Sequence, residues 1–250
     1  MSPKDIARAV LSLGLPSAIL DRAAGLRGTK YLAAAAIKSR LGRARSFQMV
    51  NVGACDGMLF DDATPWLHRI KGSKAVLVEP IPFNQKRLRE NYPDPDRFVI
   101  EPVAVTYTPG TITVKTFEES AIVSGKLPIE FVGCSSVAET NLMSGANAWG
   151  ETDTNFNKYA PYLKELEVKS DTLQVVLDRN GITYIDAFLV DCEGADWVVF
   201  DQLDLKRYRP GMIKVEIGAL TPVDIGHVIV KLKTAGYSVG LHNEDVWAFS

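Results

Sequence analysis

The segment FQMVNVGACDG, residues 47–57, constrains the fold more than any other stretch of the chain. Its apolar run with β-branched valines predicts a buried strand that ends at Gly53, and Gly57 follows four residues later. Asp61 and Asp62 then open a helical pattern. A strand, a tight glycine turn and a helix can bind a nucleotide or nucleoside at the carboxyl edge of a parallel sheet, where glycine lets the backbone turn sharply and a ligand approach. The same pattern is also typical of an ordinary strand-to-helix connection.

A second apolar run, residues 75–80, ends in Glu79 and Pro80. An acid at the end of the second strand, at about this distance from the glycines, can accept hydrogen bonds from both hydroxyls of a ribose. The alternative is an acid at the surface end of a strand. Together the two segments favour a nucleoside-binding site.

Composition and charge describe an ordinary globular protein. The 250 residues are 46% hydrophobic and 23% charged, with a net charge of −2. A pI near 6.0 gives no electrostatic reason to expect a nucleic-acid partner. The three cysteines, Cys55, Cys134 and Cys192, lack metal-ligand spacing and suggest free thiols in a reducing compartment. With no apolar run of transmembrane length, these features predict a cytoplasmic protein.

Positive charge is concentrated in the first 45 residues, which hold nine Lys/Arg against two Asp. The pattern there predicts a helical extension, residues 1–45, ahead of a main domain, residues 46–250. This extension would present a basic surface to a membrane or to an acidic partner. The alternative is a solvated face of a helical cap.

Beyond residue 57, strands and helices alternate, which predicts a parallel sheet. We expect helices over 62–71 and 82–92 and a third strand over 97–105, bent at Pro102 because proline cannot donate to a ladder. Later helices are expected over 171–178, capped by Asp171, and over 196–203 and 221–233. Strands are expected over 184–190, 212–217, 236–240 and 246–249.

Residues 106–170 interrupt this alternation. Residues 111–117 alternate with a period of two, as an antiparallel strand does, and residues 118–163 show no clear periodicity. A segment of this length inside a domain is typical of a functional loop. We therefore predict a β-rich insertion that serves as a lid, in which Trp149, Phe156, Tyr159 and Tyr162 can stack on a sugar ring or simply pack together.

Several stretches together resemble the FkbM family of S-adenosylmethionine-dependent methyltransferases: VNVGACDG, VLVEPIPFNQKRLRENY, AFLVDCEGADWVVFDQLDL, IKVEIG and GYSVGLHNEDVWAF. The resemblance covers about residues 47–249. It implies an α/β fold of class I methyltransferase type, a Rossmann-like seven-stranded sheet with its last strand antiparallel and helices on both faces. It also implies S-adenosylmethionine as the cofactor.

The resemblance implies a cofactor that lies over the Gly53–Gly57 loop, with Glu79 on the ribose, Val103 and Ala104 along the adenine, and Asp191 at the methionine end. The cofactor-binding residues expected on this basis are Asn51, Gly53, Ala54, Asp56, Gly57, Glu79, Pro80, Val103, Ala104 and Asp191. Two departures stand out. Asn51 replaces the Asp or Gln of many members, and residues 187–190 lack the lysine that often precedes the acidic pair.

Four residues are expected at the rim of the sheet beside the transferred methyl. Asp191 and Glu193 follow the fourth strand, Glu216 ends the fifth, and His242 lies in the turn after the sixth, and loops after parallel strands share one edge. A carboxylate or imidazole there can remove a proton from an acceptor hydroxyl. Glu193 can instead cap a helix, and the three carboxylates can instead hold Mg²⁺, whereas no His/Cys set suggests zinc.

The sequence therefore predicts a methyltransferase that acts on a hydroxyl, with a sugar or glycan as the first acceptor class that the family suggests. The alternatives are a small secondary metabolite, a lipid-linked acceptor or a peptide, or a non-catalytic nucleoside-binding module. A Rossmann dehydrogenase is disfavoured, because residues 53–57 lack the Gly-x-Gly-x-x-Gly spacing for a pyrophosphate. Assembly as a homo-oligomer stays open.

Overall fold

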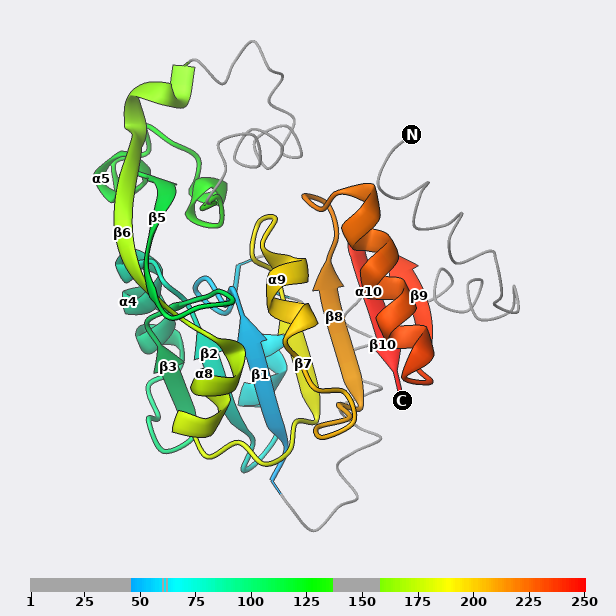
Figure 1. Cartoon of the computed structure of the whole chain (residues 1–250). Coiled ribbons are helices and arrows are strands. Elements are labelled where there is room, and N and C mark those ends of the chain that lie inside the picture. The colour runs from blue at the N-terminus through cyan, green and yellow to red at the C-terminus, as the bar shows by residue number, and fades with distance from the viewer. Residues whose placement is uncertain (1–45, 60, 62, 137–157) are drawn as a thin grey trace.

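The computed structural model describes residues 46–59, 61, 63–136 and 158–250. Its main sheet has seven strands in the order β3-β2-β1-β7-β8-β10-β9 (Figure 1). These strands are β1 (Gln48–Val52), β2 (Lys74–Val78), β3 (Phe98–Glu101), β7 (Ala187–Val190), β8 (Met212–Glu216), β9 (Ser238–His242) and β10 (Asp245–Phe249). β10 pairs antiparallel with both β8 and β9, and the pairs from β3 to β8 are parallel. The predicted sheet with an antiparallel last strand is confirmed.

The central strand β1 is buried along its whole length. Val50 and Val52 pack into one core and Met49 into the core on the opposite face. Because both faces of a parallel sheet are covered, its strands are apolar throughout rather than alternating. This is why residues 47–52 read as an apolar run.

Helices cover both faces of the sheet. α8 (Leu173–Arg179), α9 (Asp196–Asp201) and α10 (Pro222–Thr234) lie on the near face in Figure 1 and supply one core, and α4 (Pro82–Asn91) lies behind the sheet and supplies the other. The helix predicted over 62–71 is shorter, a 3₁₀ helix η1 (Thr64–His68). The helical extension predicted over 1–45 lies outside the described residues.

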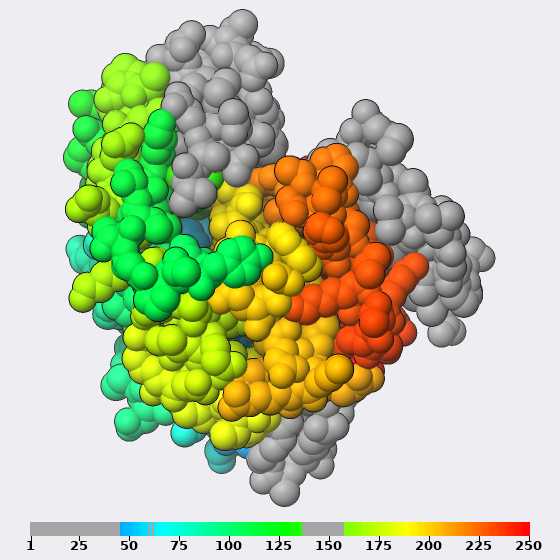
Figure 2. Space-filling model, in the orientation of Figure 1, coloured from blue at the N-terminus to red at the C-terminus, as the bar shows by residue number. Residues whose placement is uncertain are grey.

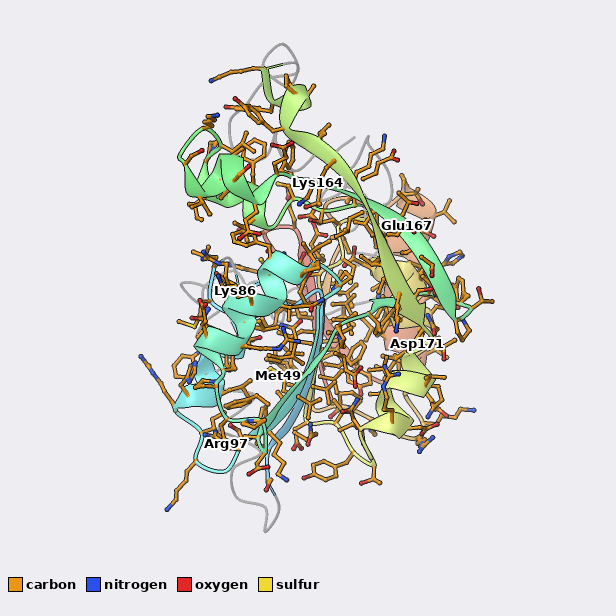
Figure 3. The ribbon with its side chains drawn as sticks, turned by 90° about the vertical axis from the view of Figure 1, so that its left-hand side faces the viewer. Met49, Lys86, Arg97, Lys164, Glu167 and Asp171 are labelled. Carbon is orange, nitrogen blue, oxygen red and sulfur yellow. The ribbon has the colours of Figure 1, made fainter. Side chains whose placement is uncertain are left out.

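The described part of the insertion forms a second sheet of three strands, in the order β4-β6-β5. It joins β4 (Ala104–Val105), β5 (Gly110–Phe117) and β6 (Leu163–Asp171), with short helices α5 (Glu119–Val123), η2 (Ile129–Val132) and η3 (Ala160–Tyr162) beyond. In Figure 3, β6 runs from Lys164 at its upper end down to Asp171 beside the main sheet. The loop between β4 and β5 reaches α9, where the Tyr107 hydroxyl donates to Asp201 at 3.2 Å (Figure 2).

The prediction of one bent strand over 97–105 is wrong. β3 ends at Glu101, and after Pro102 the chain joins the second sheet, where Ala104 pairs with Ser170 of β6. Pro102 has no N–H for the ladder of the main sheet, so the strand ends there. The change of sheet carries Val103 and Ala104 from the edge of the main sheet to the wall beside the insertion.

Two boundary predictions also need correction. Thr172, not Asp171, caps α8, since its side chain accepts a hydrogen bond from the Val175 N–H, and Asp171 instead forms an ion pair of 2.9 Å with Arg179. β7 begins at Ala187 rather than at residue 184. Among the described residues, no helix is long and apolar enough to cross a membrane.

Candidate active site

An open pocket of about 930 Å³, a volume that includes some open solvent, lies at the carboxyl ends of β1, β2 and β7. Of the residues predicted to bind a cofactor or to act in catalysis, those that line it are Gly53, Glu79, Pro80, Val103, Ala104, Asp191 and Glu193. The structure thus brings together, at one edge of the sheet, residues that are up to 140 positions apart.

The two glycines of the loop are required by protein packing alone. Gly53 has a φ of +82°, and a Cβ there would lie 1.7 Å from the carbonyl oxygen of Asp191. Gly57 has a φ of +71°, and its Cβ would lie 2.4 Å from the ring of Tyr92. Gly53 therefore allows the ends of β1 and β7 to approach, which brings the Asp191 loop beside the glycine loop.

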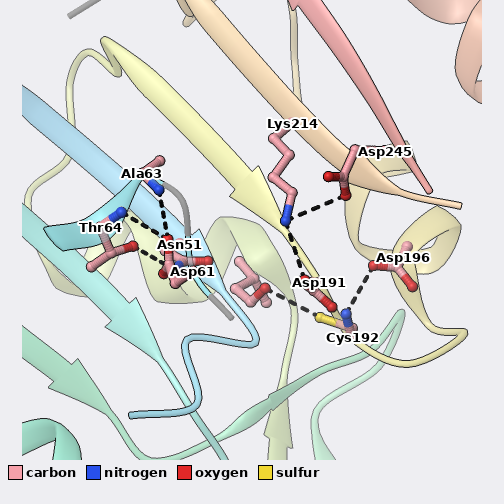
Figure 4. A network of polar contacts seen from close by, with 10 residues as sticks. Asn51, Asp61, Ala63, Thr64, Asp191, Cys192, Asp196, Lys214 and Asp245 are labelled. Atoms are coloured by element: carbon pink, nitrogen blue, oxygen red, sulfur yellow. Dashed lines mark hydrogen bonds and ion pairs between the residues drawn. The ribbon is translucent and has the colours of Figure 1, made fainter. Parts of the chain in front are cut away.

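Other predicted residues of the loop lie beneath the pocket and hold its shape. The Asn51 amide donates to Asp61 at 3.0 Å and to the Thr64 hydroxyl at 2.9 Å (Figure 4). Asp56 accepts from the N–H groups of residues 58 and 59 and forms an ion pair of 2.8 Å with Arg87. Ala54 is 1% exposed, so its side chain packs in the core. None of Asn51, Ala54, Asp56 and Gly57 lines the pocket.

Glu79 follows β2 and is 4% exposed. Its Oε2 accepts from the N–H of Cys55 at 2.9 Å, and its Oε1 accepts from the N–H of Ile81 at 2.8 Å. Burial raises its pKa to about 7, and the hydrogen bonds from these two backbone N–H groups and from the side chain of Asn84 only partly oppose this. A carboxylate has about four lone-pair positions, so the group keeps acceptor capacity for a ligand hydroxyl.

An apolar wall faces Glu79. Val103 and Ala104 form it together with Ile112 and Val114 of β5 in the insertion. Asn84 of α4 also lines the pocket, and its Oδ1 is buried without a hydrogen-bond partner in the described structure. A buried acceptor of this kind costs free energy until a donor reaches it. The pocket therefore combines an apolar surface for a flat ring with acceptor atoms for hydroxyl or amino groups.

Asp191 stands on the other side of the glycine loop, after β7. Its Oδ2 accepts from the ammonium group of Lys214 at 3.3 Å, and the same ammonium lies 3.3 Å from Oδ1 of Asp245 (Figure 4). The side chain of Asp191 is 38% exposed, and that of Lys214 is 8% exposed. Asp191 thus faces the pocket while its cation lies inside the protein.

Further carboxyl groups crowd Asp191. Burial, together with the charges of Asp191 and Asp196, raises the pKa of Glu193 to about 8. Burial and Asp191 also raise the pKa of Asp196 to about 7, and the same two causes raise that of Glu216. Glu216 does not line the pocket, and its Oε2 is buried without a hydrogen-bond partner in the described structure. Groups that titrate near neutral pH are suited to proton transfer.

His242 is the last residue of β9 rather than part of a turn, and it does not line the pocket. Sequence reasoning missed Lys214, Asn84 and Asp196. A buried lysine in the apolar run 212–217 was the signal for the first, since such a charge needs a partner. Within the described residues, no group of three His, Cys, Asp or Glu side chains is arranged to hold a metal ion.

A seven-stranded sheet in this order, with one antiparallel strand and helices on both faces, is the class I methyltransferase fold. Residues 51–239 match the model of the methyltransferase FkbM domain. The chain therefore belongs to the FkbM methyltransferase family. No curated protein matches its sequence.

Two solved structures are similar to the chain to different degrees. A methyltransferase FkbM from Methylobacillus flagellatus KT aligns with a TM-score of 0.50 and 12% identity, over 82% of this chain. The chain spans 44% of the length of that structure. A ribosomal protein L11 methylase from Lactobacillus delbrueckii subsp. bulgaricus has a TM-score of 0.39 and 9% identity, with 88% of this chain and 76% of that chain covered.

Proposed function

We propose that the protein transfers a methyl group from S-adenosylmethionine to a hydroxyl, and that the acceptor is a sugar or glycan. One observation carries the proposal: a single pocket joins a buried, backbone-held carboxylate, Glu79, to a charged carboxylate, Asp191, across the glycine loop. A nucleoside with a cationic tail needs acceptors at both of these places. Membership of a methyltransferase family supports the same assignment.

The residues present fit this cofactor. Glu79 would hold the ribose hydroxyls with its remaining lone pairs, and Val103 and Ala104 would cover the adenine ring. The unpartnered Oδ1 of Asn84 would accept from an amino or hydroxyl group of the nucleoside. Asp191 would face the positively charged methionine end. Bound there, S-adenosylmethionine would supply an activated methyl group, so that the protein has only to align the acceptor and remove its proton.

Three acids are candidates for the proton acceptor. Glu193 lines the pocket and has a pKa raised to about 8, so at neutral pH it exchanges a proton readily. Asp191 lines the pocket beside it, and Glu216 lies within the reach of their charges. We assign proton removal to Glu193 or Asp191, and to Glu216 a supporting role in setting how many protons the group holds. His242 does not line the pocket, and we assign it no direct part in proton removal.

The acidic rim favours a neutral acceptor. The carboxylate of Asp191 would repel a phosphate or carboxylate placed beside the methyl group, whereas a sugar offers hydroxyls that can donate to Asp191 and Glu193. Ser135 and Ser136, in the described part of the insertion, line the same pocket, and their hydroxyls donate to the Thr116 hydroxyl and to the Glu193 carbonyl. Tyr159 packs in a core of the insertion instead, and Trp149 and Phe156 lie outside the described residues.

The test has two stages. Calorimetry with S-adenosylmethionine should give one site per chain, and S-adenosylhomocysteine should compete for it. Transfer of a labelled methyl group is then measured on neutral glycans, on small secondary metabolites, on lipid-linked acceptors and on peptides. Label on a glycan hydroxyl supports the full proposal, and label on another class replaces the acceptor only. Binding of the cofactor with no transfer to any class would favour a non-catalytic nucleoside-binding module.

A further inference from the structure

Lys214 has no role in the scheme above, although it is a buried charge in contact with the site. It lies in the middle of β8, where it pairs in register with Leu189 of β7, and its side chain is 8% exposed. Its ammonium group lies 3.3 Å from Asp191 Oδ2 on one side and 3.3 Å from Asp245 Oδ1 on the other (Figure 4). The lysine therefore connects the pocket to the interior of the sheet.

A buried ammonium is retained only where carboxylates compensate its lost hydration. Burial lowers the pKa of Lys214, but the charges of Asp191, Asp245 and Asp61 outweigh burial and raise it above its ordinary value. Lys214 consequently stays charged at neutral pH. A charged group fixed in a strand acts on its partners through its electrostatic field.

The field of Lys214 acts on Asp191 in the presence of several neighbouring acids. Glu193 and Asp196 face it from the loop after β7 and the start of α9, and Glu216 faces it from the end of β8. Asp245, from β10, and Asp61, from the loop before η1, face Lys214. All of these groups are acids, and their mutual repulsion favours protonation of each. Among the described residues, Lys214 is the cation that forms an ion pair with Asp191 and opposes this repulsion.

We propose that Lys214 is a positioning residue that fixes Asp191 in its ionised form with one oxygen toward the pocket. The ammonium bonds Oδ2, and no described donor bonds Oδ1, so Oδ1 stays available to a ligand. The cation beside Asp191 comes from the paired strand β8, through Lys214, and not from β7, which has no lysine. The proposal rests on the proposed function only in taking the ligand of Asp191 to be the cationic end of the methyl donor.

The alternative is that Lys214 has a purely structural role and only neutralises the charge of Asp245. Three variants separate the two roles: Lys214→Met, Asp245→Asn, and the double variant, which removes the buried pair together and remains folded even if Lys214→Met alone does not. Carboxyl ¹³C NMR on protein labelled at aspartate follows the protonation of Asp191, whose signal is assigned by its loss in Asp191→Asn. This measurement needs neither cofactor nor acceptor.

We expect Asp191 to take up its proton roughly one pH unit higher in the double variant than in the wild type, and to be nearly unchanged in Asp245→Asn. An Asp191 titration in the double variant that matches the wild type would overturn the proposal. At pH 7, affinity for S-adenosylmethionine should fall about tenfold in the double variant and recover toward higher pH. If the wild type binds no S-adenosylmethionine, the proposed function fails, and the NMR titration still decides the role of Lys214.

Discussion

Glu79 and Asp191 both follow parallel strands of the main sheet, but the protein holds them in different ways. Glu79 is buried, and the backbone N–H groups of Cys55 and Ile81 bond its two oxygens. Asp191 is more than one third exposed, and its partner is the side chain of Lys214. One acid is therefore fixed by the turn in which it lies and the other by a cation on a neighbouring strand.

This difference has consequences for charge. Dipoles of the backbone offset the cost of burying Glu79 only in part, so its pKa is raised to about 7. Beside Asp191, the ammonium group of Lys214 supplies a full positive charge. Its neighbour Glu193, crowded by Asp191 and Asp196 and buried, has a pKa raised to about 8. Both sides of the site therefore carry a carboxyl group that titrates near neutral pH, and only the Asp191 side also holds a buried cation.

The largest effect is expected where the two regions meet. In Gly53→Ala, the new Cβ would lie 1.7 Å from the Asp191 carbonyl oxygen at a φ of +82°. We expect a loss of roughly 3–5 kcal/mol in the free energy of unfolding, measured with urea. Gly72→Ala is the matched control, because its φ is +72° and nothing lies within 4 Å, and it should cost only about 1 kcal/mol. Equal losses in the two variants would contradict the close approach of β1 and β7.

The second prediction concerns Glu79 alone. Replacement by the isosteric Gln removes the charge and one acceptor, and affinity for S-adenosylmethionine should fall by roughly 1–3 kcal/mol in calorimetry. The control is Glu90→Gln, an exposed change on α4, the helix that follows β2. This variant should bind S-adenosylmethionine like the wild type. Unchanged affinity in Glu79→Gln would remove the ribose assignment and leave Asp191 as the sole anchor.

The third prediction uses pH. The pKa of Glu79 is raised to about 7 and that of Glu193 to about 8, so the folded protein keeps protons that the unfolded chain has released. Their stabilising contribution is complete below about pH 4 and is lost as the pH rises through about 7 to 8. Between about pH 5.5 and 8.5 the free energy of unfolding should fall by roughly 1–3 kcal/mol. The fall should be smaller in Glu79→Gln, and stability that rises over this range would refute the assignment.

The smallest effect is expected far from both acids. Thr172 caps α8 through the Val175 N–H, and Thr172→Ala should cost about 1 kcal/mol of stability. Cofactor affinity should be unchanged, because neither Glu79 nor Asp191 touches this cap. A thermal melt combined with calorimetry measures both quantities. A large loss of affinity in this variant would mean that the two acids depend on the whole fold rather than on their own partners.

The contrast between the acids also explains what could be predicted from the sequence. The hydrogen bonds of Glu79 come from its own turn and from the glycine loop, so the residue was found from strand and glycine patterns. The partner of Asp191 is 23 positions away on β8, and its proximity depends on strand register. Local patterns likewise predicted the individual strands, and the family resemblance implied their seven-stranded arrangement. Neither predicted the passage of the chain into the second sheet after Pro102, because pairing between β4 and β6 is long-range.

The side chain of Asn84 and the cap of α8 are two further details that local sequence patterns did not predict. The pattern 82–92 predicted the helix, but a helical pattern does not show that the side chain of Asn84 enters the pocket with an unpartnered oxygen. Asp171 and Thr172 are both good caps, and the choice between them is made by the ion pair of Asp171 with Arg179.

The most direct test of the account is a crystal structure of the protein with S-adenosylhomocysteine, the demethylated form of the proposed cofactor. The account predicts that the nucleoside lies against Val103 and Ala104, that its ribose hydroxyls bond Glu79, and that its amino acid end faces Asp191. The Asp191–Lys214 contact should remain in place. A ligand bound elsewhere, or one in this pocket with its ribose away from Glu79, would contradict the assignment of Glu79 to the ribose and of Asp191 to the amino acid end.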